Sequence, residues 1–162
     1  MALRSGQIEP MQFYEDLVVG EVHRFGAYAV TREEVMAFAA RYDPQPFHLD
    51  DAAAAATHFG RLSASGWHTC AMTMSLLVER HRHSGHQGLG SPGVDDLRWL
   101  RPVYPGDTLS VETEILEKRR SATKPDRGIF RTATRVFNQD GIMVMSMTSR
   151  AMIRTRDPQA RD

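Results

Sequence analysis

The sequence predicts an α+β fold in which one long central helix is wrapped by a curved antiparallel sheet. From Gly66 to about His81, apolar residues recur three and four positions apart, which is the period of a helix buried on a broad face. After Gly93 the period changes to two, as in strands with one buried face. These strands are long, about 10 residues or more against a usual five or six. Long antiparallel strands beside one buried helix favour a sheet that curves around that helix.

The chain before the central helix is expected to hold a strand and a first helix. Residues Glu21–Val30 alternate weakly between apolar and polar, as a strand does. Thr31 and Glu34 form a capping-box pattern, in which the hydroxyl accepts from an amide three residues on and the carboxylate reaches back. A helix is therefore predicted from about Arg32 to Tyr42. It ends at Asp43-Pro44, because the residue before a proline is pushed out of the helical region.

A short alanine-rich helix and four more strands complete the predicted fold. Asp50 or Asp51 can cap this helix, which runs to about His58. The glycine-rich stretch Ser84–Gly90 is expected to be the loop that ends the central helix. Asp140-Gly141 is a strong signal for a two-residue hairpin turn. Strands are expected at Val94–Leu100, Leu109–Ile115, Gly128–Asn138 and Ile142–Arg154.

The composition indicates one globular domain in a reducing compartment, which we expect to be the cytoplasm. The 162 residues suffice for one core, and we expect it to span residues 13–155, with flexible polar ends at 1–12 and 156–162. The 20 basic and 20 acidic residues cancel, so no bulk basic field indicates nucleic acid, and self-association meets little charge repulsion. The single cysteine, Cys70, forms no internal disulfide. No stretch approaches the roughly 20 apolar residues of a membrane span.

The segment Asp43-Pro-Gln-Pro-Phe-His48 is a candidate acid/base site. Two prolines stiffen the backbone between the carboxylate and the imidazole, and an acid/base pair needs such rigidity. Histidine has the side-chain pKa nearest neutrality, and a carboxylate beside it can orient a shared water. The spacing alone leaves an alternative open, in which Asp43 only ends a helix and His48 only bonds backbone.

The segment Ser65-Gly66-Trp67-His68 opens the predicted central helix. Free amides at a helix N-terminus point outward, and the helix dipole favours negative charge there. Gly66 carries no side chain to block a ligand, so its amide is a candidate for polarising a carbonyl oxygen. The alternative is that Gly66 simply allows a tight turn.

Several segments, in this order, resemble the motifs of the MaoC-like dehydratases, a family that includes the R-specific enoyl-CoA hydratases. They are Tyr42–Asp50, Phe59-Gly60-Arg61, Ser65-Gly66 and Arg101–Asp107. The resemblance covers roughly Phe13 to Ile153. It implies a hotdog fold, at least a homodimer, and an acyl-CoA tunnel near the protomer interface. It also implies that Asp43 and His48 activate water, that the Gly66 amide holds the thioester oxygen, and that no cofactor is needed beyond the coenzyme A of the substrate.

Two positions depart from the family pattern. Gln45 stands where the family usually has Asn, so any hydrogen bond from its amide must be rearranged by one methylene. Met74 occupies the place of a Ser that assists some hydratases, and Ser75 points about 100° away from it. We expect the substrate pocket to draw on Gln45, Phe47, Ser65, Trp67, His68 and Met74.

The sequence therefore predicts a hydro-lyase that adds water reversibly to a trans-2-enoyl thioester and gives a 3-hydroxyacyl thioester. A hotdog acyl-CoA thioesterase is the first alternative, although Glu79, near the far end, is the only carboxylate on the central helix. A catalytically silent subunit that binds acyl thioesters is the second. No metal site is expected. The cluster His81, His83 and His86 has the character of cationic side chains at a helix C-terminus rather than of zinc ligands.

Overall fold

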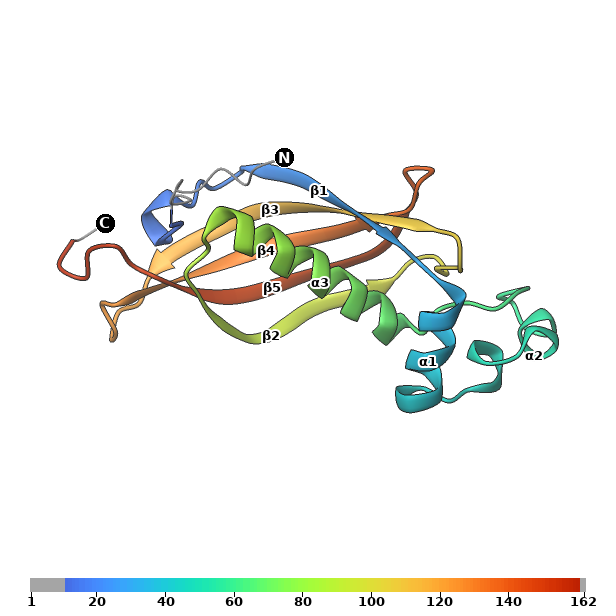
Figure 1. Ribbon diagram of the computed structural model, residues 1–162. Helices are drawn as coiled ribbons and strands as arrows, with labels where there is room; N and C mark the ends of the chain where they lie inside the picture. Colours follow the sequence, from blue (N-terminus) through green and yellow to red (C-terminus); the bar gives the residue numbers. More distant parts are fainter. Residues whose placement is uncertain (1–10, 161–162) are drawn as a thin grey trace, which may run out of the picture.

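The computed structural model describes residues 11–160, which form one five-stranded antiparallel sheet with a long helix against one face (Figure 1). The strands follow the order β1-β3-β4-β5-β2 across the sheet, and every neighbouring pair is antiparallel. The long helix, α3, packs chiefly on β1 and β3. This confirms the predicted α+β fold. The strands are β1 (Val22–Ala29), β2 (Gly88–Trp99), β3 (Thr108–Arg120), β4 (Arg127–Phe137) and β5 (Met143–Arg154), and the helices are η1 (Tyr14–Asp16), α1 (Arg32–Tyr42), η2 (Pro46–His48), α2 (Asp51–Ala55) and α3 (Gly66–Ser84).

The helices begin where the sequence places their caps. The Thr31 hydroxyl accepts from the amide of Glu34 at the start of α1, and Asp50 accepts from the amide of Ala53 at the start of α2. α2 is shorter than predicted and α3 runs one turn longer, to Ser84. Within residues 11–160, no helix combines the length and apolar character needed to cross a membrane.

The loop predicted at Ser84–Gly90 is wrong over its last three residues, because β2 already begins at Gly88. β2 is an edge strand that bonds β5 alone, and its register shifts at three places. Most of its side chains are exposed, so no alternation of buried and exposed residues marks its first half. Edge strands tolerate glycines and irregular pairing that a central strand excludes.

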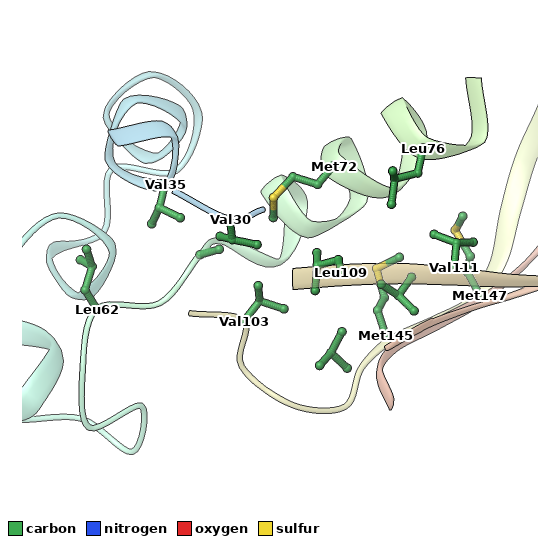
Figure 2. Close-up of a cluster of buried hydrophobic side chains, with 13 residues drawn as sticks. Val30, Val35, Leu62, Met72, Leu76, Val103, Leu109, Val111, Met145 and Met147 are labelled. Atoms are coloured by element: carbon green, nitrogen blue, oxygen red, sulfur yellow. The ribbon is translucent and has the colours of Figure 1, made fainter. Parts of the chain in front are cut away.

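The core is divided between two clusters on the same sheet face. The larger one joins the first half of α3 to β3 and β5, and includes Met72, Leu76, Val111 and Met145 (Figure 2). The smaller one gathers at the opposite end of the sheet around Tyr14, Leu17, Phe130 and Ile153. All the fully buried side chains of α3 lie between His68 and Leu76. The second half of α3 therefore spans the gap between the clusters.

The two ends of the chain were predicted to be flexible, and residues 1–10 and 161–162 lie outside the described residues. Within the described part, the Gln12 amide donates to the Gly85 carbonyl at 3.1 Å. Arg156 pairs with Asp16 at 2.6 Å. These contacts attach the beginning and the end of the described chain to the same end of the sheet, and the flexibility beyond them stays a prediction.

Candidate active site

Asp43 and His48 lie beyond the N-terminal end of α3, where α1 and α2 cap one end of the sheet (Figure 1). Asp43 ends α1, and its amide donates to the Ala39 carbonyl at 3.0 Å. Pro46 then starts η2, whose last residue is His48. The two turns bring the Asp43 Oδ2 and the His48 Nε2 to 3.5 Å. The proline-bounded segment therefore presents a carboxylate and an imidazole face to face.

Two donors fix the Asp43 carboxylate. The Ser65 hydroxyl donates to Oδ2 at 2.7 Å, and the Gln45 amide donates to Oδ1 at 2.7 Å. The Ser65 hydrogen bond is the largest influence on the pKa of Asp43, and together with Gln45 and the nearby His48 it lowers that pKa despite partial burial. Asp43 is therefore an ionised carboxylate near neutral pH, held at both oxygens.

The tautomer of His48 follows from its other nitrogen. His48 is 4% exposed, and its Nδ1 lies 2.7 Å from the Ser63 carbonyl oxygen. A carbonyl only accepts, so Nδ1 carries the hydrogen, and in this tautomer the Nε2 lone pair points toward Asp43. Two acceptors 3.5 Å apart form no hydrogen bond with each other, but one water can donate a hydrogen to each. The pair is thus arranged to hold and deprotonate water.

The start of α3 joins this pair directly. The Ser65 side chain caps α3 by accepting from the Trp67 amide at 3.2 Å, and it donates to Asp43 at the same time. The Gly66 amide, the first of the helix, has no acceptor among the described residues. It lies next to the site and is free to donate to a ligand, as the helix dipole favours.

Gly66 is required by a close neighbour rather than by a tight turn. A Cβ on Gly66 would lie 2.5 Å from Cε2 of the Trp99 indole, which lies over the helix start from β2. Trp99 also packs edge-on against Trp67, with ring centroids 5.2 Å apart. Sequence reasoning missed Trp99 as a site residue, because nothing in the pattern of β2 distinguishes it from a surface aromatic.

The motif segments that are far apart in the sequence meet around His48. Phe47 packs on the His48 ring at 4.6 Å and on Phe59 at 5.2 Å. The carbonyl of Phe59 accepts from the Tyr104 hydroxyl at 2.8 Å, and the Arg61 guanidinium stacks 3.9 Å above the Tyr104 ring. The segments Phe59-Gly60-Arg61 and Arg101–Asp107 therefore contact each other, and Phe59 joins them to the His48 ring.

The remaining predicted pocket residues, His68, Trp67 and Met74, lie in different surroundings from one another. His68 is buried and stacks flat on Phe38 at 4.6 Å, between α3 and α1, with its Nδ1 unpaired. Trp67 is exposed beside Trp99, and Met74 is 52% exposed two turns further along α3. The structure thus joins Gln45, Phe47 and Ser65 to the acid/base pair, while His68 and Met74 make no hydrogen bond or ring contact with Asp43 or His48 within the described residues.

Comparison with known proteins identifies the family to which this chain belongs. The sequence model of the MaoC like domain matches residues 17–135. The chain belongs to the MaoC-like domain family. Its residues are 33% identical, over 132 positions, to an (R)-specific enoyl-CoA hydratase from Aeromonas caviae, covering 81% of this chain and 87% of that protein.

Two solved structures identify the fold of this MaoC-like chain. The MaoC-like dehydratase from Rhodospirillum rubrum superposes with a TM-score of 0.80 at 41% identity, over 90% of this chain and 99% of that one. A conserved hypothetical protein from Mycobacterium tuberculosis with a double hotdog fold superposes with a TM-score of 0.75 at 18% identity, over 94% of this chain and 46% of that one. The hotdog fold is therefore confirmed. Among residues 11–160, no group of three or more His, Cys, Asp or Glu side chains is arranged to hold a metal ion.

The site of this MaoC-like chain also shows what the Gln45 side chain does at the position where the family usually has Asn. The extra methylene relative to Asn lets the amide reach back two residues to the Asp43 Oδ1. The sequence predicted that any hydrogen bond from the Gln45 amide would be rearranged. In the structure this amide donates to the Asp43 carboxylate itself.

Proposed function

We propose that this MaoC-like protein is a hydro-lyase that adds water reversibly to a trans-2-enoyl thioester and gives a 3-hydroxyacyl thioester. One observation carries the proposal: the ionised Asp43 and the lone pair of His48 Nε2 face each other across 3.5 Å, beside the free Gly66 amide. The relative named (R)-specific enoyl-CoA hydratase supports coenzyme A as the thiol.

In the proposed reaction, a single water donates one of its hydrogens to Asp43 and its second hydrogen to His48 Nε2. His48 takes the second proton as the water oxygen forms a bond to the β carbon of the enoyl group. The π electrons of the α–β double bond move toward the thioester and give an enolate. The imidazolium, stabilised by the Asp43 carboxylate, then returns the proton to the α carbon. The pair ends in its starting state, and the reverse sequence eliminates water.

In this proposal, the Gly66 amide stabilises the oxygen that becomes negative in this step. A helix N-terminus favours that charge, and the donor is already oriented before reaction. The Trp99 indole over Gly66 provides an apolar wall at the same place. A wall of this kind excludes water and strengthens the hydrogen bond from the amide.

We further propose that the protein works as a homodimer. The outer face of α3 and the edge strand β2 together expose apolar side chains beside the Gly66 site: Trp67, Met74, Val78, Val94, Trp99 and Leu100. Within residues 11–160, β2 also leaves one edge without a neighbouring strand. A second copy fits both features, because it can pair with this edge and cover the apolar face. Light scattering after gel filtration tests this, and a monomer at micromolar concentration would contradict it.

Two substitutions test the reaction. Asp43→Asn removes the charge that faces His48, and His48→Ala removes the base. Each is expected to lower the kcat/KM for crotonyl-CoA hydration, followed by loss of enoyl absorbance, by roughly 10²–10⁴-fold. Asp51→Asn is the matched control, since Asp51 pairs with Arg32 on the surface and is expected to leave the rate unchanged.

The assay also separates the alternative functions. Full activity in both Asp43→Asn and His48→Ala would refute the assignment. Release of free CoA, measured with a thiol reagent, would indicate a thioesterase. Binding of crotonyl-CoA without turnover would indicate a silent subunit. Glu79, the carboxylate on which a thioesterase would depend, is exposed near the far end of α3 and therefore does not support the thioesterase alternative.

A further inference from the structure

A cavity of about 490 Å³ lies between the second half of α3 and the sheet. It separates the two hydrophobic clusters of the core, with Met147 at one end and Phe130 at the other. Its lining includes neither Asp43, His48 nor Gly66. The cavity is therefore a compartment distinct from the acid/base site, and nothing in the proposed reaction yet uses it.

The floor of the cavity is a patch of hydroxyl groups. Thr113 on β3 pairs with Thr134 on β4, and Thr132 on β4 pairs with Ser149 on β5. Residues opposite each other in a sheet, and residues two apart on one strand, share a face. Thr113, Thr132, Thr134 and Ser149 therefore form one contiguous patch, which we call the hydroxyl floor.

The hydroxyl floor lacks internal partners. Thr132 is 9% exposed, and its Oγ1 is buried without any hydrogen bond. Among the described residues, no hydrogen bond is made by the side chains of Thr113, Thr134 or Ser149 either. Buried hydroxyls are nearly always paired, because leaving one unpaired is costly. A cavity that received only alkyl chain would leave this whole patch unpaired.

The wall of the cavity that belongs to α3 carries an unpaired positive charge. The Arg80 guanidinium lies 5.5 Å from the Phe25 ring, and no carboxylate of the described residues lies within 4 Å of it. Phe25 pairs with Val111, two residues before Thr113 on β3, so Arg80 lies diagonally across from the hydroxyl floor. The cavity carboxylate, Glu21, lies 3.4 Å from His23 instead.

The two other histidines of the cavity are engaged with each other. His81 and His86 stack at 4.3 Å, and His86 Nδ1 contacts the Gln12 Oε1 at 3.2 Å. Burial is the main cause that lowers the pKa of both rings, so neither adds a charge near neutral pH. Arg80 is therefore the permanent cation of the cavity.

The helix α3 connects the proposed thioester site at Gly66 with this cavity. The helix rises about 1.5 Å per residue, so Gly66 and Arg80 lie roughly 21 Å apart along it. Met74 lies between them in the sequence and lines the cavity together with Val94 of β2, the strand that also carries Trp99 over Gly66. Arg80 lies six residues further along the helix, about 120° around its axis from Met74, and contacts Phe25 of β1.

We infer that the cavity receives the far end of a long acyl chain and that this end carries a carboxylate, a conclusion that rests on the proposed action on acyl thioesters. Met74, Leu77 and Phe25 provide apolar surface for the chain. A carboxylate matches the planar fork of Arg80 and accepts from several hydroxyls at once. The substrate class is thus the mono-thioester of a long dicarboxylic acid, with the thioester at Gly66 and the free carboxylate between Arg80 and the hydroxyl floor.

Binding of unreactive thioesters tests this assignment without turnover. Isothermal titration would compare hexadecanoyl-CoA with the mono-CoA thioester of hexadecanedioic acid, and the octanoyl pair would serve as a shorter control. The wild-type protein is expected to bind the long diacid thioester at least about tenfold more tightly than its methyl-ended counterpart. Arg80→Met is expected to abolish this preference, and Thr132→Val is expected to reduce it.

Arg82→Met is the matched control, because Arg82 is an exposed residue on the same turn of α3 that does not line the cavity. It is expected to retain the full preference. Equal binding of the two long thioesters by the wild-type protein, or a preference unchanged in Arg80→Met, would overturn the inference. Hydration of crotonyl-CoA reports separately on the proposed function. A protein that hydrates crotonyl-CoA but ignores the distal carboxylate would refute only the cavity assignment.

Discussion

Substituting Ser65 by Ala tests whether one hydroxyl both begins α3 and holds the carboxylate of Asp43, the proposed catalytic group. Ser65 is fully buried, accepts from the Trp67 amide, and donates to Asp43 at 2.7 Å. Loss of an N-cap costs about 1 kcal/mol. Loss of a hydrogen bond to an ionised group costs about 1.5–3 kcal/mol, and Asp43 is mostly shielded from solvent, with 19% of its side chain exposed. The free energy of unfolding is therefore expected to fall by about 2.5–4 kcal/mol.

This loss is expected to lower the Tm by roughly 5–15 °C, at about 2–4 °C per kcal/mol for a chain of this size. It also has a pH signature. The Ser65 hydrogen bond is the main cause that lowers the pKa of Asp43, so its removal raises that pKa. Because the folded pKa lies below the unfolded one, this carboxylate stabilises the protein above the unfolded pKa, and the contribution is lost as the pH falls through the folded pKa. In Ser65→Ala that contribution shrinks, and the acidic limb of kcat/KM moves to higher pH.

Thr31→Ala provides the control. Thr31 caps α1 by accepting from the Glu34 amide and makes no contact with Asp43. It is expected to cost only the cap, about 1 kcal/mol, without moving the pH profile of crotonyl-CoA hydration. If Ser65→Ala cost no more than Thr31→Ala and left the acidic limb in place, the hydrogen bond from Ser65 would not be what keeps Asp43 ionised.

Three further substitutions test other contacts. Gly66→Ala places a Cβ 2.5 Å from the Trp99 indole and is expected to lower kcat/KM at least about tenfold, with partial recovery in a double variant that also carries Trp99→Leu, because the smaller side chain makes room. Gly128→Ala would overlap the Tyr14 ring and is expected to cost about 1–3 kcal/mol in thermal unfolding, while the rate at low temperature stays unchanged. Burial lowers the pKa of His86 to about 4, so protonation of the unfolded chain should destabilise the protein as the pH falls from about 6.5 toward 4, and His86→Gln should show a flatter dependence of Tm on pH over this range. An equally steep dependence in that variant would contradict the burial of a neutral ring.

The fold was largely predictable because its main signals are local. The capping residue Thr31 and the proline after Asp43 bound α1 as observed, and the three-four period marks α3 from its first residue. The first half of β2 was not predictable. Its residues are held by pairing with β5, a contact distant in sequence, and their side chains face solvent, so they carry no period.

The sequence predicted Asp43 and His48 as a pair, and the structure brings them to 3.5 Å, but two of the groups around them could not be predicted. Asp43 and His48 are close in sequence, and two prolines mark their segment. The Ser63 carbonyl that fixes the tautomer of His48 and the Trp99 ring over Gly66 come from distant segments, and a backbone carbonyl has no sequence signature at all. His68 was predicted as a pocket residue, and its stacking on Phe38 was not predictable, because Phe38 lies on a different helix.

The divided core has a consequence for motion within α3. The buried anchors of this helix end at Leu76, and its last two turns lie over a cavity instead of packed side chains. Local opening is easiest where few buried contacts hold an element, so amide hydrogen exchange is expected to quicken along α3 from its start toward Ser84. The acid/base site is joined to the slow-exchanging end, while the cavity lies under the fast one. One helix can thus keep the proposed reaction geometry rigid at its first turn and adapt to different acyl chains in the proposed binding cavity at its last.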